Sequence, residues 1–327
     1  MKIAIIEGGP STEAEVSRAS ATSLALALKE SGHETHQLEL CAQLSQKLLQ
    51  LAPDVVFPAA HGTQGEDGCV QGLLEVLRLP YVGSDVRASA MAADKACSKV
   101  FFRAAGLRVA RERILTRKDQ GTPCSQLLST LRAKLSKNLI LKPVQGGSTI
   151  GISRILSSAT PDNFAQALSL ALQYDAQVLV EEYIEGREIT CGVIDEGSGP
   201  RALAATLIIA EASDWYDFES KYAQGGSKHI CPAPLSAPLL KKIQEMSVLA
   251  HEVLGARDLS RADFIIDEND EPYLLEVNTL PGMTKTSLFP EAARVSGLPF
   301  AQWTNQLVVI AQKRAPGRGA QGVALPS

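Results

Sequence analysis

Apolar and polar positions follow two different periods in the first ninety residues. Short apolar runs, KIAII and DVVFPAA, are each followed by segments with helical spacing. In one such segment Val70, Leu73, Leu74 and Leu77 fall at i, i+3, i+4 and i+7, so they share one helical face. Strands that alternate with helices are typical of a parallel sheet. The pattern therefore predicts a parallel α/β domain over residues 1–87.

The pattern changes character after Gly83. A helical stretch over 88–105, a strand VARERIL, a helix over 127–135 and an apolar strand NLILKP predict a central domain over 88–178. Longer strands then form hairpin-like pairs, first VLVEEYI with EITCGVI and ALAATLII, later DFIID with PYLLEV. These predict a mixed α+β domain over 179–312. The tail 313–327 is rich in Pro, Gly and small residues, so we expect it to be disordered.

The composition narrows the class of protein. A chain of 327 residues suggests two or three domains. No apolar run approaches the roughly 18 residues that a membrane span needs. The net charge of −4 does not indicate the basic surface that nucleic-acid binding requires. The six cysteines are scattered without a CxxC pair, which favours reduced thiols, and the N-terminus MKIAIIEGG reads as a strand rather than a signal peptide. We therefore expect a cytoplasmic protein without membrane or nucleic-acid partners.

The segment SRADFIIDENDEPYLLEVNT contains two strand patterns around a polar turn. If paired residues have numbers that sum to 539, one face carries only residues that can pack in a core, namely the pairs Ala262 with Val277, Phe264 with Leu275, and Ile266 with Tyr273. Alternate residues on a strand share a face, and antiparallel partners face the same way. The other face then carries Arg261 opposite Asn278 and Asp263 opposite Glu276.

The two carboxylates on this polar face need compensation. At a separation of about 4 Å they repel by roughly 4 kcal/mol at an effective dielectric near 20. A divalent cation would offset this repulsion, and Asp263, Glu276 and Asn278 offer the hard oxygen ligands that Mg²⁺ prefers. A solvated surface face is the alternative. We predict a metal site, since the asparagine lies beside the glutamate at strand spacing.

The segment NLILKPVQGGSTIG has the features of a phosphate-binding loop. Lys142 ends an apolar strand, and Gly146, Gly147 and Ser148 follow. Glycines let backbone N–H groups approach an anion, and the lysine adds a point charge. A plain Gly/Ser hairpin loop is an equal alternative for this segment alone. No GxxxxGK[ST] or GxGxxG string occurs in the chain, which disfavours P-loop NTPases and Rossmann dehydrogenases.

Three further positions are candidates with open structural alternatives. Lys95 follows Asp94, a good N-cap, and opposes the helix dipole unless an anion binds there, although an ordinary surface lysine would also fit. The segments around Glu15 and His61 follow predicted strands, at the end of a parallel sheet where ligand sites form. However, Glu15 has capping-box spacing from Thr12, and His61 could be a turn residue.

Taken together, these motifs resemble the D-alanine:D-alanine ligases of the ATP-grasp superfamily, from Met1 to about Ala311. The strings are GGPSTEAEVS, HGTQGEDG, DKACSK, KPVQGGSTIG, VEEYIEGREIT, FESKY, SRADF and LEVNTLPGMTKTSL, in that order. The resemblance implies an ATP-grasp fold, α/β and α+β, with a Rossmann-like N-terminal domain and ATP held between the central and C-terminal domains. It also implies a homodimer, because members of the family are commonly dimeric.

The resemblance further implies a reaction. The carboxylate of one D-alanine attacks the γ-phosphate of ATP, which gives an acyl phosphate and ADP. The amine of a second D-alanine then displaces phosphate to form D-alanyl-D-alanine for peptidoglycan precursors. Two Mg²⁺ ions, for which Mn²⁺ can substitute, would bridge the triphosphate.

The family pattern assigns roles residue by residue. The implied nucleotide contacts are Lys95, Lys142, Gly147, Ser148, Glu181, Glu182, Ile184, Glu188 and Lys221. The implied metal ligands are Asp263, Glu276 and Asn278. The implied substrate contacts are Glu15, His61, Lys221, Gly282, Ser287 and Leu288, and the implied catalytic group is Glu15, Ser148, Tyr222 and Arg261.

Within these sets the implied tasks differ. Glu15 would hold the ammonium of the first substrate, and Arg261 with the backbone N–H of Gly282 would stabilise the tetrahedral oxyanion. Lys221 and Tyr222 would belong to a lid over the site. Glu7 and Pro10 depart from the family pattern, but neither matches a residue assigned to chemistry.

Three other functions compete with this prediction. A related ligase would make D-alanyl-D-lactate or D-alanyl-D-serine, and the residue at Tyr222 would discriminate, because depsipeptide-forming relatives differ there. A catalytically silent nucleotide sensor would have lost one of Arg261, Asp263, Glu276 or Asn278, and all four are present. A Rossmann oxidoreductase is disfavoured by the absent dinucleotide fingerprint.

Overall fold

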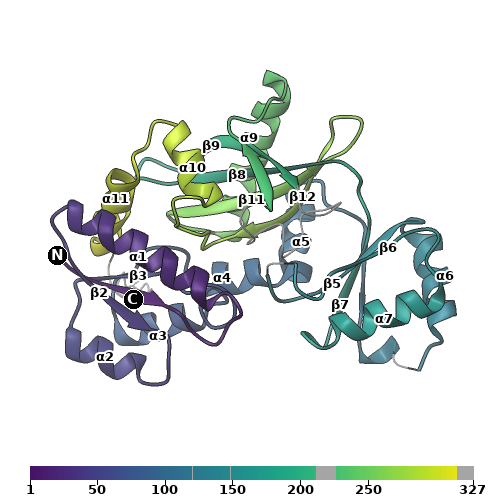
Figure 1. Ribbon diagram of the computed structural model, residues 1–327, viewed down its shortest axis with the longest axis horizontal. Coiled ribbons are helices and arrows are strands. Elements are labelled where there is room, and N and C mark those ends of the chain that lie inside the picture. Colours follow the sequence, from purple (N-terminus) through teal and green to yellow (C-terminus); the bar gives the residue numbers. More distant parts are fainter. Residues whose placement is uncertain (120, 148, 211–225, 315–327) are drawn as a thin grey trace, which may run out of the picture.

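The computed structural model describes residues 1–119, 121–147, 149–210 and 226–314. Within these ranges the chain forms one parallel and two antiparallel sheets, each covered by helices (Figure 1). The predicted residues Ser148, Lys221 and Tyr222, the string FESKY and nearly all of the tail 313–327 lie outside the described residues.

The N-terminal sheet is parallel, as predicted, with strand order β2-β1-β3. Its strands are β1 (Lys2–Glu7), β2 (Glu34–Glu39) and β3 (Val55–Pro58), and the helices that follow them are α1 (Ala14–Glu30), α2 (Leu44–Leu51) and α3 (Cys69–Leu77). Ile3 and Ile5 of β1 pack in the core that contains α1, whereas Ala4 and Ile6 pack in the core that contains α2 and α3. Burial on both faces explains the continuous apolar run in β1, which is typical of parallel strands.

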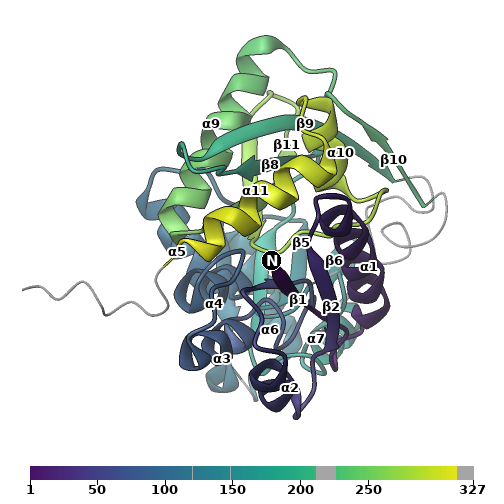
Figure 2. The same ribbon diagram turned by 90° about the vertical axis from the view of Figure 1, so that its left-hand side faces the viewer.

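The last described helix, α11 (Phe300–Gln312), returns to this N-terminal sheet and lies across α1 (Figure 2). Trp303 is fully buried and stacks edge-on against Phe289 and Phe300, with ring centroids 5.5 and 5.2 Å apart. The sequence pattern assigned this helix to the 179–312 domain. Its apolar face packs both on residues of that region, such as Phe289, and on α1, so the two ends of the chain share one core.

A four-stranded antiparallel sheet stands apart at the other side of the molecule (Figure 1). Its strands are β4 (Glu112–Leu115), β5 (Leu139–Pro143), β6 (Ser153–Ile155) and β7 (Val178–Glu182), in the order β4-β7-β5-β6. The helices α6 (Cys124–Lys134) and α7 (Pro161–Ala171) cover one face, and a 3₁₀ turn spans Arg117–Asp119. Because β7 pairs with both β4 and β5, this sheet extends past the expected division between 178 and 179.

The third sheet has the order β10-β9-β8-β11-β12. Its strands are β8 (Arg187–Ile194), β9 (Arg201–Ala210), β10 (Ser227–Ile230), β11 (Leu259–Ile266) and β12 (Pro272–Asn278). The helix α9 (Ala237–Leu254) covers one face together with part of α5 (Lys95–Ala104), and α10 (Leu288–Val295) packs on β8 and β9.

The single helix expected over 88–105 is two helices, α4 (Val86–Ala93) and α5. Asp94 has an extended backbone and forms a β-bridge with Gln145, which interrupts the helix. Its side chain accepts a hydrogen bond from the Cys97 N–H at 2.8 Å, so it is the N-cap of α5 as predicted. The break directs α5 toward the loop that follows β5.

The register of the β11–β12 hairpin is confirmed at its polar end and wrong beyond it. Arg261 pairs with Asn278 and Asp263 pairs with Glu276, as predicted. A β-bulge follows Asp263, so Phe264 pairs with Leu274 rather than Leu275. The next pairs shift in the same way, and Ile266 meets Pro272 instead of Tyr273.

The bulge has a consequence for the two faces of β12. Leu274 and Val277 are buried in the core under α9, whereas the successive residues Leu275 and Glu276 both line the cavity described below. A bulge adds one residue and re-aims a side chain, which a constant register cannot anticipate.

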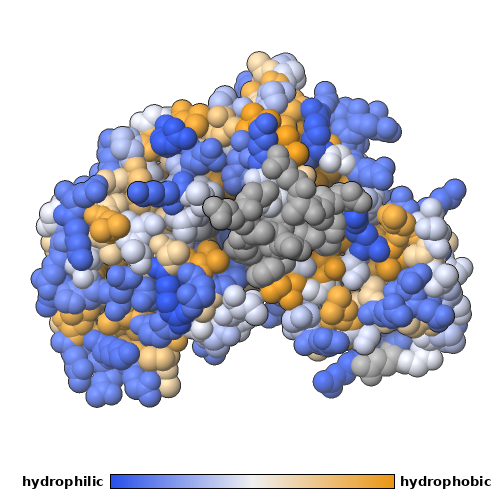
Figure 3. Space-filling model, in the orientation of Figure 1, coloured by the Kyte–Doolittle hydropathy of each residue, from blue (hydrophilic) through white to orange (hydrophobic). Residues whose placement is uncertain are grey.

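The surface is predominantly polar on the visible face, with hydrophobic residues in small separate groups (Figure 3). No helix in the described ranges is long and apolar enough to cross a membrane.

Candidate active site

Two adjoining cavities lie between the three sheets, with volumes of about 530 and 190 Å³. They share six lining residues: Lys95, Gly146, Gly147, Glu188, Asp263 and Glu276. The polar face of the β11–β12 hairpin thus forms part of the boundary between the two cavities. A group held there can contact a molecule in either one.

Arg261 and Asp263 form a closely paired unit on this face. The Nε and Nη2 atoms of Arg261 donate to the two carboxylate oxygens of Asp263 at 2.9 and 2.8 Å. Thr190 Oγ1, from the neighbouring β8, donates to Asp263 Oδ1 at 2.5 Å. The guanidinium therefore compensates one of the two facing carboxylates and holds it in a fixed orientation.

The other carboxylate and the amide have partners from different elements. Lys95 Nζ lies 3.6 Å from Glu276 Oε2, and Asn278 Oδ1 accepts the Leu280 N–H at 2.8 Å. Within the described ranges no three His, Cys, Asp or Glu side chains cluster as a metal site. Two carboxylates and one amide oxygen nevertheless fit Mg²⁺ when phosphate oxygens and water complete its shell.

The smaller cavity combines buried charge with apolar walls. Lys142 Nζ contacts Glu181 Oε2 at 2.6 Å, and Lys95 Nζ donates to the Gly146 carbonyl oxygen. The apolar lining residues are Ile140, Ile150, Ile152, Ile184, Ile265 and Leu275. An apolar slot whose lining also includes Lys95 and Lys142 suits a heterocyclic base joined to an anionic chain.

The structure brings most of the predicted nucleotide residues to this cavity. Those that line it are Lys95, Lys142, Gly147, Glu181, Glu182, Ile184 and Glu188. Glu182 directs its carboxylate to Arg111, whose Nε lies 2.7 Å away, so its carboxylate is occupied by an exposed ion pair.

Lys99 is a buried charge that the sequence analysis missed. Its side chain is 1% exposed and contacts Glu181 Oε1, and it lies 3.6 Å from Glu112 Oε2. Burial, and then the ammonium of Lys142, lower the pKa of Lys99 to about 7. Spacing could have identified it, because Lys95 and Lys99 are four residues apart on one helical face.

His61 is buried in the larger cavity and is held across domains. Its Nε2 atom lies 3.3 Å from Ser20 Oγ, which also accepts the Met283 N–H at 3.1 Å. Burial lowers the pKa of His61, while the charge of Glu13 opposes that shift. A neutral imidazole therefore lines this part of the cavity.

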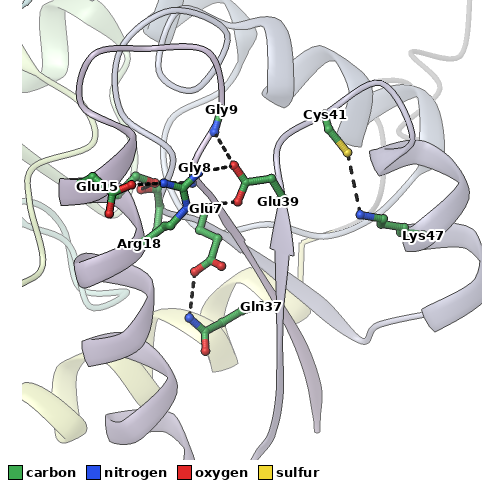
Figure 4. A network of polar contacts seen from close by, with 11 residues as sticks. Glu7, Gly8, Gly9, Glu15, Arg18, Gln37, Glu39, Cys41 and Lys47 are labelled. Atoms are coloured by element: carbon green, nitrogen blue, oxygen red, sulfur yellow. Dashed lines mark hydrogen bonds and ion pairs between the residues drawn. The ribbon is translucent and has the colours of Figure 1, made fainter.

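Glu13 and Glu15, at the start of α1, point to different places. Glu15 borders the larger cavity, but its side chain is 88% exposed and pairs with Arg18, as Figure 4 shows. Glu13 lies closer to the other site groups: Cβ atoms placed on Gly62 and Gly147 would be 3.4 and 3.5 Å from Glu13 Oε2. The structure therefore places Glu13, which the sequence analysis missed, beside His61.

The local reason is the start of α1. Glu13 is the N-cap and makes no side-chain capping bond, so Thr12 and Glu15 do not form the capping box that their spacing allows. Arg18 links Glu15 to Glu39, and Glu39 Oε1 accepts the Gly9 N–H at 3.2 Å (Figure 4). This network fixes the loop before α1 and turns Glu15 outward.

A third acid, Glu66, lies in the same cavity. Its Oε1 atom accepts the Gly62 N–H at 3.0 Å, and its Oε2 atom is buried without a hydrogen-bond partner among the described residues. Burial, and then the charge of Glu13, raise the pKa of Glu66 to about 8. One of two neighbouring acids is thus held neutral near physiological pH.

The predicted residues after β12 form a compact turn at the far wall. Thr284 donates from its backbone N–H to Ser287 Oγ at 3.1 Å, and the two hydroxyl oxygens are 2.7 Å apart. A Cβ on Gly282 would lie 2.9 Å from Ser287 Oγ, so the glycine permits this close approach. Leu288 begins α10 beside them and lines the cavity.

The two departures from the family pattern stay away from the cavities. Glu7 accepts a hydrogen bond from Gln37 Nε2 at 2.8 Å on the outer part of the sheet (Figure 4). Pro10 is exposed. Neither residue lines either cavity.

Comparisons with known proteins agree with this geometry. A family model described as the D-ala D-ala ligase C-terminus matches residues 101–309, and one described as the N-terminus matches residues 33–84. The chain is 40% identical to the D-alanine–D-alanine ligase of Geobacter sulfurreducens over 98% of this chain and 96% of that protein.

Solved structures of similar proteins share the fold. The D-alanine–D-alanine ligase from Bacillus anthracis complexed with ATP matches with a TM-score of 0.78 and 28% identity, over 97% of this chain and 98% of that one. The VanG D-Ala:D-Ser ligase from Enterococcus faecalis matches with a TM-score of 0.79 and 28% identity, over 95% and 99%. The expected ATP-grasp fold is thereby confirmed, and the chain belongs to the D-alanine–D-alanine ligase family.

Proposed function

We propose that this enzyme joins two D-alanine molecules at the expense of ATP, releasing ADP and phosphate. The observation that carries the proposal is the polar face of β11 and β12. It sets Asp263 and Glu276 at the boundary between a lysine-lined apolar cavity and a larger polar one, and it sets Arg261 and Asn278 beside them in the larger cavity. A nucleotide in the first and amino acids in the second would meet at this face.

The smaller cavity is the nucleotide cavity of this proposal, and its apolar slot binds the base. Glu181 to Ile184 contact adenine, and Glu188 contacts the ribose. Lys95 and Lys142 bind phosphate oxygens, together with the backbone of the loop at Gly147. The proposal keeps the three domains that the resemblance implies, because residues of both the central sheet and the C-terminal sheet line this cavity.

Asp263, Glu276 and Asn278 would hold Mg²⁺, which would supply positive charge to offset that of the transferring phosphoryl group. Asp263 would then share its carboxylate between Arg261 and the ion. Arg261 has five N–H donors, and the two nitrogens that donate to Asp263 are Nε and Nη2, so the guanidinium could donate to the oxyanion as well.

The reaction then follows two displacements. The carboxylate of the first D-alanine attacks the γ-phosphorus, and ADP leaves with the bond's electron pair. The amine of the second D-alanine attacks the resulting acyl phosphate, loses a proton, and expels phosphate. Arg261 and the N–H of Gly282 stabilise the negative oxygen of the tetrahedral intermediate.

The resemblance implies Glu15 for the ammonium of the first amino acid, and Glu15 also lines the larger cavity. We propose Glu13 for this contact instead. Its carboxylate faces the larger cavity beside His61, where it can pair with the ammonium of the first amino acid. Ser287 and Leu288 contact the second substrate on the opposite wall. Ser148 keeps its expected nucleotide contact, and Lys221 and Tyr222 keep their expected lid roles, as part of this proposal.

An ADP-release assay with single amino acids tests the function. D-Alanine should support ADP release with formation of the dipeptide, whereas L-alanine should not. Adding D-serine or D-lactate beside D-alanine separates this proposal from the related ligase activities. ADP release without a dipeptide product, or a preference for D-lactate as second substrate, would contradict it.

We further infer a homodimer that works in the cytoplasm, where ATP is available. Light scattering after size-exclusion chromatography measures the mass directly, against 34.9 kDa for one chain. A monomer at assay concentrations would remove the dimer from the proposal without affecting the reaction.

A further inference from the structure

A chain of alternating charges runs inward from the nucleotide cavity. Lys142 Nζ contacts Glu181 Oε2 at 2.6 Å, and Lys99 Nζ contacts the other oxygen, Oε1. The side chains of Lys99 and Glu181 are each 1% exposed, whereas Lys142 reaches the cavity. Both oxygens of one buried carboxylate are thus held by lysines with different access to ligand.

The three residues come from three elements that meet at this point. Glu181 lies on β7, directly between Glu112 of β4 and Ile140 of β5 in register. Lys99 is on α5, which approaches from the C-terminal sheet. Its ammonium therefore links the two halves that enclose the nucleotide cavity.

Phosphate binding would change the charges that surround Glu181. If Lys142 turns to a phosphate, as the proposed function requires, Glu181 loses one of its two cations. A buried carboxylate without compensation is strongly unfavourable, and it would protonate or reorient. Lys99 remains on Oε1, since it is buried and does not line the cavity.

We propose that Lys99 is a positioning residue for nucleotide binding, which holds Glu181 ionised and oriented while Lys142 serves the phosphate. This inference rests on the proposed function, because it assumes a nucleotide in the smaller cavity. The departure of Lys142 also removes one of the charges that lower the pKa of Lys99, so the ammonium form of Lys99 is favoured when the nucleotide is bound.

The test is nucleotide binding measured by calorimetry, with ADP and Mg²⁺ as the probe. In Lys99→Met the dissociation constant for ADP should rise at least about tenfold, the range expected for one charge-assisted bond. Lys99→Arg, which keeps the charge, should recover part of the loss. Arg103→Met is the matched control, because Arg103 lies on the same helix and contacts Glu112 but not Glu181.

A double-mutant cycle separates positioning from general support of the fold. In a Glu181→Gln background there is no carboxylate to compensate, so adding Lys99→Met should change the ADP dissociation constant by less than about threefold. Thermal unfolding of each variant shows whether it is folded. A full Lys99→Met effect that persists in the Glu181→Gln background would overturn the proposal.

The outcomes also separate this inference from the proposed function. A wild-type enzyme that fails to bind ADP would contradict the nucleotide site itself. If the wild-type enzyme binds ADP and the dissociation constant is the same in folded Lys99→Met, only the positioning role is contradicted.

Discussion

The clearest test of the site compares two glutamates that are two residues apart. We predict that Glu13→Gln will weaken the binding of the first D-alanine, whereas Glu15→Gln will leave it nearly unchanged. Glu13 faces the cavity beside His61, and Glu15 is 88% exposed and pairs with Arg18. The two substitutions remove the same charge from the start of the same helix, so each is the control for the other.

The structure sets the expected magnitudes. A hydrogen bond to a charged group contributes roughly 1.5 to 3 kcal/mol, and each 1.4 kcal/mol is about tenfold in affinity. Glu13→Gln should therefore raise the KM for D-alanine at the first subsite by about 10- to 100-fold. Exposed ion pairs contribute little, so Glu15→Gln should stay within about threefold of wild type.

The assay follows ADP release while D-alanine is varied, with the data fitted to two substrate-binding steps. Propionate, which has the carboxylate but no ammonium, serves as a competitive inhibitor. Its inhibition constant should be the same in wild type and Glu13→Gln, because only the ammonium contact is lost. A larger effect from Glu15→Gln than from Glu13→Gln, or an equal loss of propionate binding, would refute the assignment.

Three further predictions concern the reacting groups. Asp263→Asn should abolish turnover and leave thermal unfolding close to wild type, with partial recovery at high Mg²⁺; near-normal activity at low Mg²⁺ would rule out the metal role. Arg261→Lys should raise the activation free energy of acyl transfer by about 3 kcal/mol, because lysine lacks the planar fork of arginine. Rapid-quench analysis should then detect ADP formed ahead of dipeptide. Tyr222→His should shift the product toward D-alanyl-D-lactate as pH falls toward 6, since the imidazole, with an ordinary pKa of about 6.5, becomes protonated. A product ratio that is constant with pH in this variant would remove Tyr222 from that role.

The sequence determined the parallel sheet and the polar face of the hairpin. Apolar runs indicated β1 and β3, and helical spacing indicated α3, because local spacing alone determines which residues share one face of a helix or strand. Arg261, Asp263, Glu276 and Asn278 followed from strand alternation near the polar end, where the register is regular. The motif strings identified the family, and most residues that they imply do line the two cavities.

Tertiary contacts set the β-bulge, the orientation of the two glutamates and the buried ion pair, none of which follows from local spacing. The bulge after Asp263 depends on how Leu274 packs under α9 and Leu275 faces the cavity, and neither contact is visible in a pairing rule. Glu13 and Glu15 are the same residue type two positions apart. Only the ion pairs of Arg18 with Glu15 and Glu39 turn Glu15 outward. Lys99 and Glu181 are 82 residues apart in the sequence, and their side chains meet only in the folded chain, where one comes from α5 and the other from β7. Long-range packing therefore selected which charges are buried, and burial determines which of them act on a ligand.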